Sequence, residues 1–130
     1  MEPYQGELKE VAKDNDDFRR VLFTGAHSQL VVMALASGEE IGEEVHAVDQ
    51  ILYAVEGEGE AFLDGRRKSF EKGDAVAVPA GTRHNILNTG VTALRLYTIY
   101  APPEHAPGTI HRTKAEADAA EARHLSAATA

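Results

Sequence analysis

Short apolar runs alternate with polar turns over most of this chain, a pattern that predicts strands rather than helices. Two apolar runs, 18–24 and 29–36, flank the polar connection Gly25-Ala-His27-Ser28. Later runs recur at intervals of about ten residues, as in sandwiches and barrels. The expected strands are 18–24, 29–36, 43–48, 50–56, 60–63, 66–70, 75–78, 83–88 and 92–100. The pattern therefore predicts an all-β barrel or sandwich.

The two ends of the chain differ from this β-rich middle. Residues 1–17 are polar and mostly charged, and a weak apolar spacing there fits either a short helix or an extended arm. Pro102-Pro103 ends the last strand, and Thr113-Lys-Ala-Glu116 fits a capping box that opens a helix to about His124. We therefore expect an N-terminal arm over 1–17, a β-barrel over 18–103, and a C-terminal loop and helix over 104–130.

Composition narrows the functional class. The length of 130 residues suits one domain. With 21 acidic against 13 basic residues, the net charge of −8 disfavours binding to nucleic acid or anionic membranes. The absence of cysteine excludes thiolate zinc sites and a cysteine nucleophile. No apolar run approaches membrane-spanning length and the first residues are polar and acidic, so we expect a cytoplasmic protein.

One segment carries residues of chemical interest at fixed offsets. Gly73-Asp-Ala-Val-Ala-Val-Pro79-Ala-Gly81-Thr-Arg-His84-Asn-Ile-Leu-Asn88 places a short apolar strand before a proline-glycine turn, and the chain then re-enters as a strand with His84. This pattern resembles the second motif of the cupin superfamily. The resemblance implies a double-stranded β-helix, or jelly-roll, barrel in which His84 is a metal ligand and Asn88 a structural hydrogen bonder.

An earlier segment is similar to the first cupin motif, with two substitutions. Anchored at Gly38 and Gly57, the motif places Glu44 where cupins usually carry their first histidine. His46 takes the second histidine position, and Gln50 replaces the usual glutamate. The resemblance therefore implies that Glu44, His46, Gln50 and His84 hold a divalent ion.

The residues themselves support this set in two ways. Glu44, His46 and Gln50 share even numbering, so in an unbroken strand they would point to one face. Two imidazoles, one carboxylate and one amide oxygen suit Fe, Mn, Ni, Co or Zn. The alternative is a degenerate barrel that has lost its metal. Asp49 is a possible substitute ligand, although a surface or turn role is favoured for it.

Resemblance to the cupins does not choose a reaction, because these barrels include dioxygenases, decarboxylases, isomerases, lyases, epimerases and non-catalytic binders. Gln50 cannot take up a proton as a base, so Glu44 is the candidate catalytic residue, either as a metal ligand or as a free base. We expect dioxygenase-type chemistry on a small oxygenated substrate. The alternatives are proton transfer of the sugar isomerase or lyase type, with Glu44 as base, and ligand binding without turnover.

Two features outside the motifs bear on the site and on assembly. His105 and His111 lie in a proline-bounded tail that could fold over a barrel mouth or a partner subunit, and we favour surface or interface roles for them. The apolar run 18–24 predicts an exposed sheet edge, which favours a homodimer formed by sheet extension.

Overall fold

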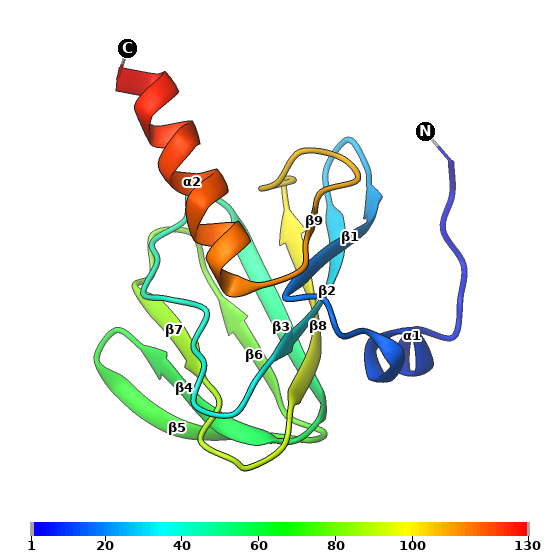
Figure 1. The fold of residues 1–130 in the computed structure, drawn as a ribbon, viewed down its shortest axis with the longest axis vertical. Coiled ribbons are helices and arrows are strands. Elements are labelled where there is room, and N and C mark those ends of the chain that lie inside the picture. Colours follow the sequence, from blue (N-terminus) through cyan, green and yellow to red (C-terminus); the bar gives the residue numbers. More distant parts are fainter. Residues whose placement is uncertain (1, 130) are drawn as a thin grey trace.

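The computed structural model describes residues 2–129, with side chains described through residue 123. In this part of the chain two antiparallel sheets face each other and form a barrel (Figure 1), as the sequence predicts. The larger sheet has the strand order β6-β3-β8-β2-β1-β9 and the smaller one has the order β5-β4-β7. The elements are α1 (Leu8–Asp14), β1 (Arg19–Thr24), β2 (Gln29–Leu35), β3 (Asp49–Glu56), β4 (Glu58–Leu63), β5 (Arg66–Glu71), β6 (Ala75–Val78), β7 (His84–Leu87), β8 (Leu94–Ala101), β9 (Ile110–His111) and α2 (Lys114–Thr129).

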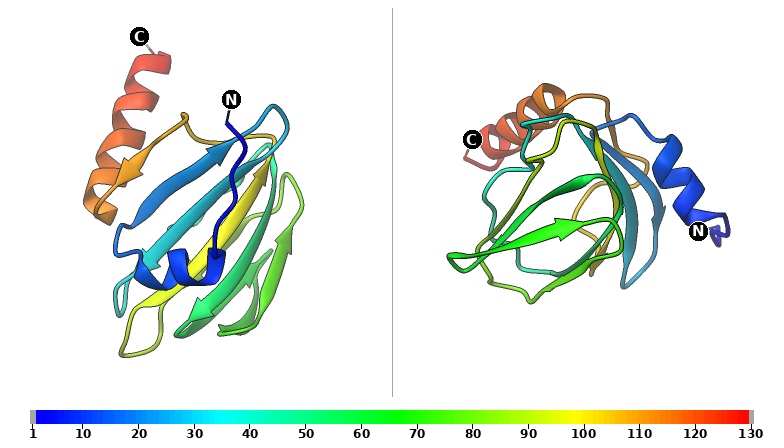
Figure 2. Two further views of the ribbon diagram at one scale, coloured as in Figure 1. Left: turned by 90° about the vertical axis from the view of Figure 1, so that its right-hand side faces the viewer. Right: turned by 90° about the horizontal axis from the view of Figure 1, so that it is seen from below.

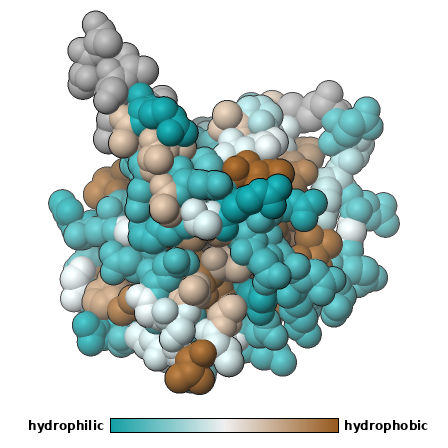
Figure 3. Space-filling model, viewed as in Figure 1, coloured by the Kyte–Doolittle hydropathy of each residue, from teal (hydrophilic) through white to brown (hydrophobic). Residues whose placement is uncertain are grey.

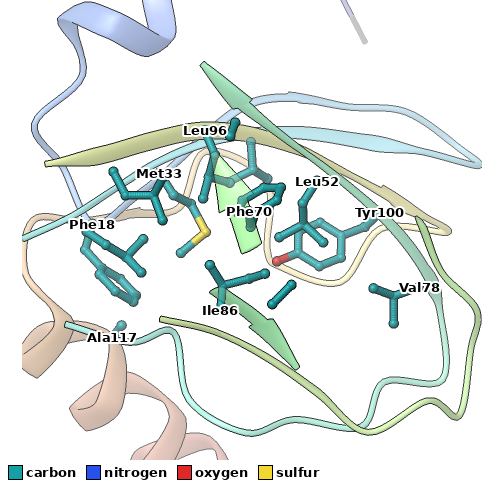
Figure 4. Packing of buried hydrophobic residues seen from close by; sticks show 14 of the residues in the cluster. Phe18, Met33, Leu52, Phe70, Val78, Ile86, Leu96, Tyr100 and Ala117 are labelled. Carbon is teal, nitrogen blue, oxygen red and sulfur yellow. The ribbon is translucent and has the colours of Figure 1, made fainter. Parts of the chain in front are cut away.

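The main core fills the space between the sheets. Strands β7 and β8 alternate buried and partly exposed residues, so one face of each strand contributes to the interior. Figure 4 shows Met33, Leu96 and Phe70, each fully buried, packed within this interior. Strand β2 is buried on nearly every residue, which indicates that its outer face is covered as well.

Helix α1 provides that cover, so the helical alternative for residues 1–17 is the correct one. The helix lies across the outer face of the larger sheet (Figure 2). Its Ala12 is fully buried against Val32 and Val55. Arg95 of β8 fixes the end of the helix, because its guanidinium donates to the carbonyl of Asn15 at 3.0 Å and pairs with Asp16 at 2.6 Å.

The segment before β3 differs from the sequence prediction. We expected a strand over 43–48, but only Glu40 and Glu44 form isolated bridges, to Leu87 and His84 of β7. Residues 45–48 have no strand structure. The chain therefore leaves the edge of the smaller sheet at Glu44 and enters the larger sheet at Asp49.

The C-terminal region returns to the barrel. Strand β9 pairs with Arg19 and Arg20 of β1, so the predicted exposed edge over 18–24 is partly covered by the chain itself. The homodimer stays a prediction. Half of the predicted capping box is present at the start of α2, where the hydroxyl of Thr113 accepts from the Glu116 N–H at 3.1 Å; the Glu116 carboxylate accepts from the Arg112 N–H at 2.6 Å instead of from Thr113. The helix runs to Thr129, beyond the predicted end near His124.

The molecular surface follows the acidic composition. The face drawn in Figure 3 is largely hydrophilic, and its apolar side chains form small separate patches. Among the described residues, no helix has both the length and the apolar character needed to cross a membrane.

Candidate metal centre

Gln50 and His84 meet in the interior and join the two sheets. Gln50 lies on β3 of the larger sheet and His84 begins β7 of the smaller one, and their exposed fractions are 3% and 5%. The Nε2 atom of His84 lies 3.0 Å from Oε1 of Gln50. The structure thus brings together one residue from each motif, which lie 34 positions apart in the sequence.

The hydrogen bonds around this pair fix the direction of both side chains. The Thr98 hydroxyl donates to the Ile51 carbonyl at 2.9 Å, so its oxygen accepts from the Gln50 amide nitrogen at 3.0 Å. This orients Oε1 of Gln50 toward His84. Nδ1 of His84 donates to the Thr82 carbonyl at 2.8 Å, because a carbonyl can only accept. A neutral His84 therefore presents the lone pair of Nε2 to an amide oxygen, an arrangement that a cation between the two would favour.

Glu44 and His46 form the second pair. Glu44 is placed beside His84 by reciprocal backbone hydrogen bonds, both of 2.9 Å. Nε2 of His46 lies 3.3 Å from Oε2 of Glu44, and Nδ1 lies 3.5 Å from Oε1 of Glu104. The backbone carbonyl of His46 accepts from the Gly81 N–H at 2.8 Å, so the proline-glycine turn of the second motif supports this residue directly.

The two histidines share one arrangement. Each has Nδ1 against an outer oxygen and Nε2 directed at another predicted ligand. Histidines that bind metals usually give their second ring nitrogen to a carbonyl or carboxylate in this way. Ligand atoms held at about 2.1 Å from one ion lie about 3 Å apart, close to the separations within both pairs. The donor set thus fits a divalent ion in kind and in pairwise spacing.

The Gln50–His84 pair and the Glu44–His46 pair lie close together but do not form one four-residue cluster. The ring centroids of His46 and His84 are 5.1 Å apart and the rings are tilted by 54°. Within the described residues, no group of three or more His, Cys, Asp or Glu side chains is gathered closely enough to hold an ion. Binding all four groups to one ion therefore requires side-chain rotation that draws the two pairs together.

The prediction that the first-motif residues share one face of an unbroken strand is wrong. Glu44, His46 and Gln50 do not lie on one strand, because residues 45–48 leave the sheet. They converge because the segment crosses from the edge of β7 to the start of β3, and the donors on either side face the same interior.

Burial dominates the electrostatics of the carboxylate. Desolvation raises the pKa of Glu44 above its ordinary value, while the charges of His46 and Arg19 act in the opposite direction. Tyr100 is packed edge-on against the His46 ring, with ring centroids 6.0 Å apart, and burial raises its pKa strongly as well. The site is thus weakly solvated, and burial disfavours the charged form of both Glu44 and Tyr100.

The tail after β8 contributes residues that the sequence analysis did not assign to the site. Gln29 is fully buried, and its Oε1 accepts from the backbone N–H groups of Glu104 and His105 at 3.1 and 2.9 Å. This places Glu104 against His46 and packs the His105 ring edge-on against Tyr100, with ring centroids 5.1 Å apart. Desolvation lowers the pKa of His105 to about 3. His105 is thus only partly exposed in this chain, and the interface role expected for it stays a prediction.

Two further sequence expectations concern neighbouring polar residues. The Asn88 side chain is fully buried and donates to the carbonyls of Leu35 and Thr92 at 3.0 and 2.9 Å, as expected of a structural hydrogen bonder. Asp49 is exposed, and its Oδ1 accepts from the Ala80 N–H at 2.9 Å. It stabilises the proline-glycine turn and points away from the other candidate ligands.

Two cavities lie near the candidate ligands. One, of about 270 Å³, is lined by His84 itself together with Phe62, Asn85 and Leu87. The other, of about 360 Å³, is lined by His105 and by Glu104, which contacts His46.

Comparison with known proteins agrees with this architecture. Residues 31–100 match the cupin domain, and this range includes both sequence motifs and all four candidate ligands. The chain belongs to the cupin family. A cupin relative in Bacillus subtilis (strain 168), the uncharacterized protein YrkC, is 45% identical over 127 residues, which cover 92% of this chain and 68% of the relative.

Solved cupin structures show the same fold. The protein BH2720 from Bacillus halodurans is 42% identical and has a TM-score of 0.88, covering 91% of this chain and 95% of its own. A predicted oxalate decarboxylase from Thermotoga maritima is 27% identical with a TM-score of 0.56, covering 58% of this chain and 67% of its own. The cupin family therefore includes both enzyme-like and uncharacterized neighbours of this chain.

Proposed function

We propose that this cupin is a metal-dependent enzyme that acts on a small oxygenated molecule. The observation that carries the proposal is the common arrangement of His46 and His84, each with Nδ1 against an outer oxygen and Nε2 directed at Gln50 or Glu44. We propose Glu44, His46, Gln50 and His84 as the ligands of Fe, Mn, Ni, Co or Zn.

The protein side chains would prepare the site in distinct ways. His84 and Gln50 are rigidly held by Thr82 and Thr98, so they form the fixed part of the ligand set. Glu44 is the most accessible of the four, with its side chain 24% exposed, and it neighbours the position where a substrate would enter. A divalent ion bound here would supply Lewis-acid polarisation of a substrate oxygen and open positions for further oxygen ligands.

Dioxygenase-type chemistry is the first candidate reaction. The contact between Glu44 and His46 supports a set of two histidines and one carboxylate, which is the ligand set of many non-haem iron oxygenases. Proton transfer of the isomerase or lyase type is the second candidate. The raised pKa of Glu44 supports it, because a base is most effective when its pKa lies near the working pH.

Metal content is the direct test. Untagged protein would be purified after growth with each candidate metal and measured by plasma mass spectrometry, beside His84→Ala and Glu44→Ala. We expect near-stoichiometric metal in the parent and at least about a hundredfold lower affinity in His84→Ala, because that variant loses a ligand held in the fixed pair. Asp49→Ala is the matched control, since Asp49 points away from the set, and it should load like the parent.

The variants also separate the two candidate reactions. Metal lost in Glu44→Ala supports a ligand role and justifies screening for oxygen consumption. Metal retained in Glu44→Ala supports a free base, which would be checked by metal-dependent hydrogen exchange of candidate substrates in deuterated water. A parent that takes up no metal under any supplementation would overturn the proposal in favour of a barrel that binds ligands without a metal.

A further inference from the structure

Arg19 is buried without a carboxylate in ion-pair contact, which a buried arginine normally has. It is 7% exposed at the start of β1, beneath α2. No carboxylate among the described side chains lies within the 4.0 Å that defines an ion pair with it. Its Nε atom is buried and has no hydrogen-bond partner among the side chains and backbone that the structure describes. Buried charges are usually paired, because the desolvation of an unpaired charge in a protein costs roughly several kcal/mol.

This arginine lines a cavity large enough for a small molecule. The cavity has a volume of about 360 Å³, and its wall includes Arg19, Glu104, His105, Thr109, His111 and Glu121. Ligand pockets typically have volumes of roughly 300 Å³ or more. Because Glu104 also contacts His46, the cavity and the candidate metal centre share one wall.

The other polar groups of the cavity leave Arg19 as its main positive charge. Nδ1 of His111 accepts from Nη1 of Arg19 at 3.1 Å, so this imidazole orients the guanidinium and does not compete with it. Burial and the charge of Arg19 lower the pKa of both His111 and His105. Nε2 of His105 is buried and, like Nε of Arg19, has no hydrogen-bond partner.

The charges around the cavity favour a singly charged, planar anion. A guanidinium edge matches the two oxygens of a carboxylate. Glu104 and Glu121 line the same cavity and would repel a doubly charged phosphate more strongly than a single carboxylate. The positive charge of Arg123 of α2 also acts on His111 and lowers its pKa.

We propose that this cavity binds the carboxylate of a small organic acid, with Arg19 as the residue that anchors it. The binding site follows from the geometry of the cavity alone, whereas its use as a substrate site rests on the proposed function. In that role the carboxylate lies against Arg19, and an oxygen substituent of the acid extends past Glu104 toward His46. The substrate class would then be small hydroxy or oxo acids.

Binding of acetate to the chelator-treated protein tests the anchor without a metal. Two-dimensional amide NMR spectra would be recorded during titration with acetate, acetamide and inorganic phosphate. We expect acetate to shift the resonances of Thr109, His111 and neighbouring residues saturably, and acetamide at least about tenfold more weakly, since it lacks the charge. Equal shifts by acetate and acetamide would overturn the proposal, and tighter binding of phosphate would overturn the carboxylate assignment.

Variants on β1 provide the matched comparison. Arg19→Gln should weaken acetate at least about tenfold, and Arg19→Lys should retain part of the affinity because it keeps the charge. Arg20→Gln is the control, since Arg20 is the exposed neighbour on the same strand. Arg19→Gln should leave the melting temperature unchanged or raise it, because it removes an unpaired buried charge. A purely structural arginine would instead lower the melting temperature and leave acetate shifts intact in the folded fraction.

Glycolate, which adds a hydroxyl to acetate, connects the cavity to the metal centre. In metal-loaded protein, glycolate should bind at least about tenfold more tightly than acetate, while the two acids should bind alike in chelator-treated protein. Arg19-dependent acetate binding in a protein that takes up no metal would uphold the carboxylate site and reject the proposed function. Metal uptake without acetate binding would reject the carboxylate site and leave the proposed function standing.

Discussion

The two ends of the barrel interior differ in polarity. One apolar cluster runs from Phe18, Met33 and Ala117 at one end to Val78 and Tyr100 at the other (Figure 4). At the other end, Gln50 lies opposite Val78 and Tyr100 in strand register and carries the hydrogen bonds to Thr98 and His84. Apolar burial stabilises the first end, whereas burial of polar groups gives little net stabilisation at the second. The comparison indicates that the apolar end maintains the fold and the polar end is retained for binding.

Of the variants that test this comparison, the one without the Phe70 ring should show the largest loss of stability. Phe70 is fully buried on β5 between the sheets, so Phe70→Ala should lower the free energy of unfolding by about 4 kcal/mol. Metal and acetate affinities of the folded protein should stay within about twofold, because mutations at sites that share no contacts act independently. Urea unfolding with metal titration checks both values.

The matched control is Phe62→Ala on the neighbouring strand β4. Phe62 is only partly buried on the outer face, where the Arg67 guanidinium lies over its ring, so its loss should cost about 1 kcal/mol. Equal losses of stability in the two variants, or a large loss of metal affinity in Phe70→Ala, would contradict the division between the two ends.

Acid should destabilise the polar end through His105. The pKa of His105 is lowered to about 3 in the folded protein, from the 6.5 of an unperturbed histidine, so the unfolded chain binds an extra proton between these values. Stability from this residue is complete above pH 6.5 and is lost progressively as the pH falls toward 3. At about pH 4.5 the cost is on the order of 2–3 kcal/mol, and His105→Gln should not show it.

Urea unfolding of the parent and His105→Gln at several pH values measures this difference. The loss of stability of the parent relative to the variant should begin below pH 6.5 and grow with each step toward acid. Parallel pH profiles would show that His105 is protonated as easily in the folded chain as in the unfolded one, and would contradict its burial against Tyr100.

Glu104→Gln should have the smallest effect and the most specific one. The variant keeps the size of the side chain but removes the charge that faces Nδ1 of His46, so metal affinity should fall about tenfold. Acetate affinity should rise, because a carboxylate is removed from the wall of the Arg19 cavity. Isothermal titration with each ligand gives both values. Loss of both affinities together would indicate a general structural role for Glu104.

The sequence predicts the fold well because its turn residues are explicit. The spacing of Gly73, Pro79 and Gly81 places β6 and β7 correctly, and the apolar runs locate most other strands to within two residues. The strand expected over 43–48 is wrong. Glu44 lies at the edge of the smaller sheet, and residues 45–48 cross to β3, so the alternating pattern spans two different surroundings and not one strand. Local pattern cannot distinguish a strand from such a crossing.

The candidate site was predicted only in part, for a related reason. The sequence motifs bring Glu44, His46, Gln50 and His84 into consideration, and the structure brings these residues together in two pairs. Glu104 and Arg19 carry no motif. Their positions depend on Gln29, which fastens the tail, and on β9, which pairs with β1. These are long-range contacts that no local spacing encodes.

Because Gln29 fixes the tail to the barrel, the part of the chain that folds together extends beyond the barrel strands. The match to the family stops at residue 100, yet the Gln29 side chain bonds to the backbone of Glu104 and His105, and Ala117 completes the core beside Phe18. A chain cut after residue 100 would leave the fully buried Gln29 amide with three broken hydrogen bonds and the Phe18 ring open to water. The range of the family match and the folding unit are therefore different stretches of the same polypeptide, and a swap of barrels between relatives would have to carry the tail along.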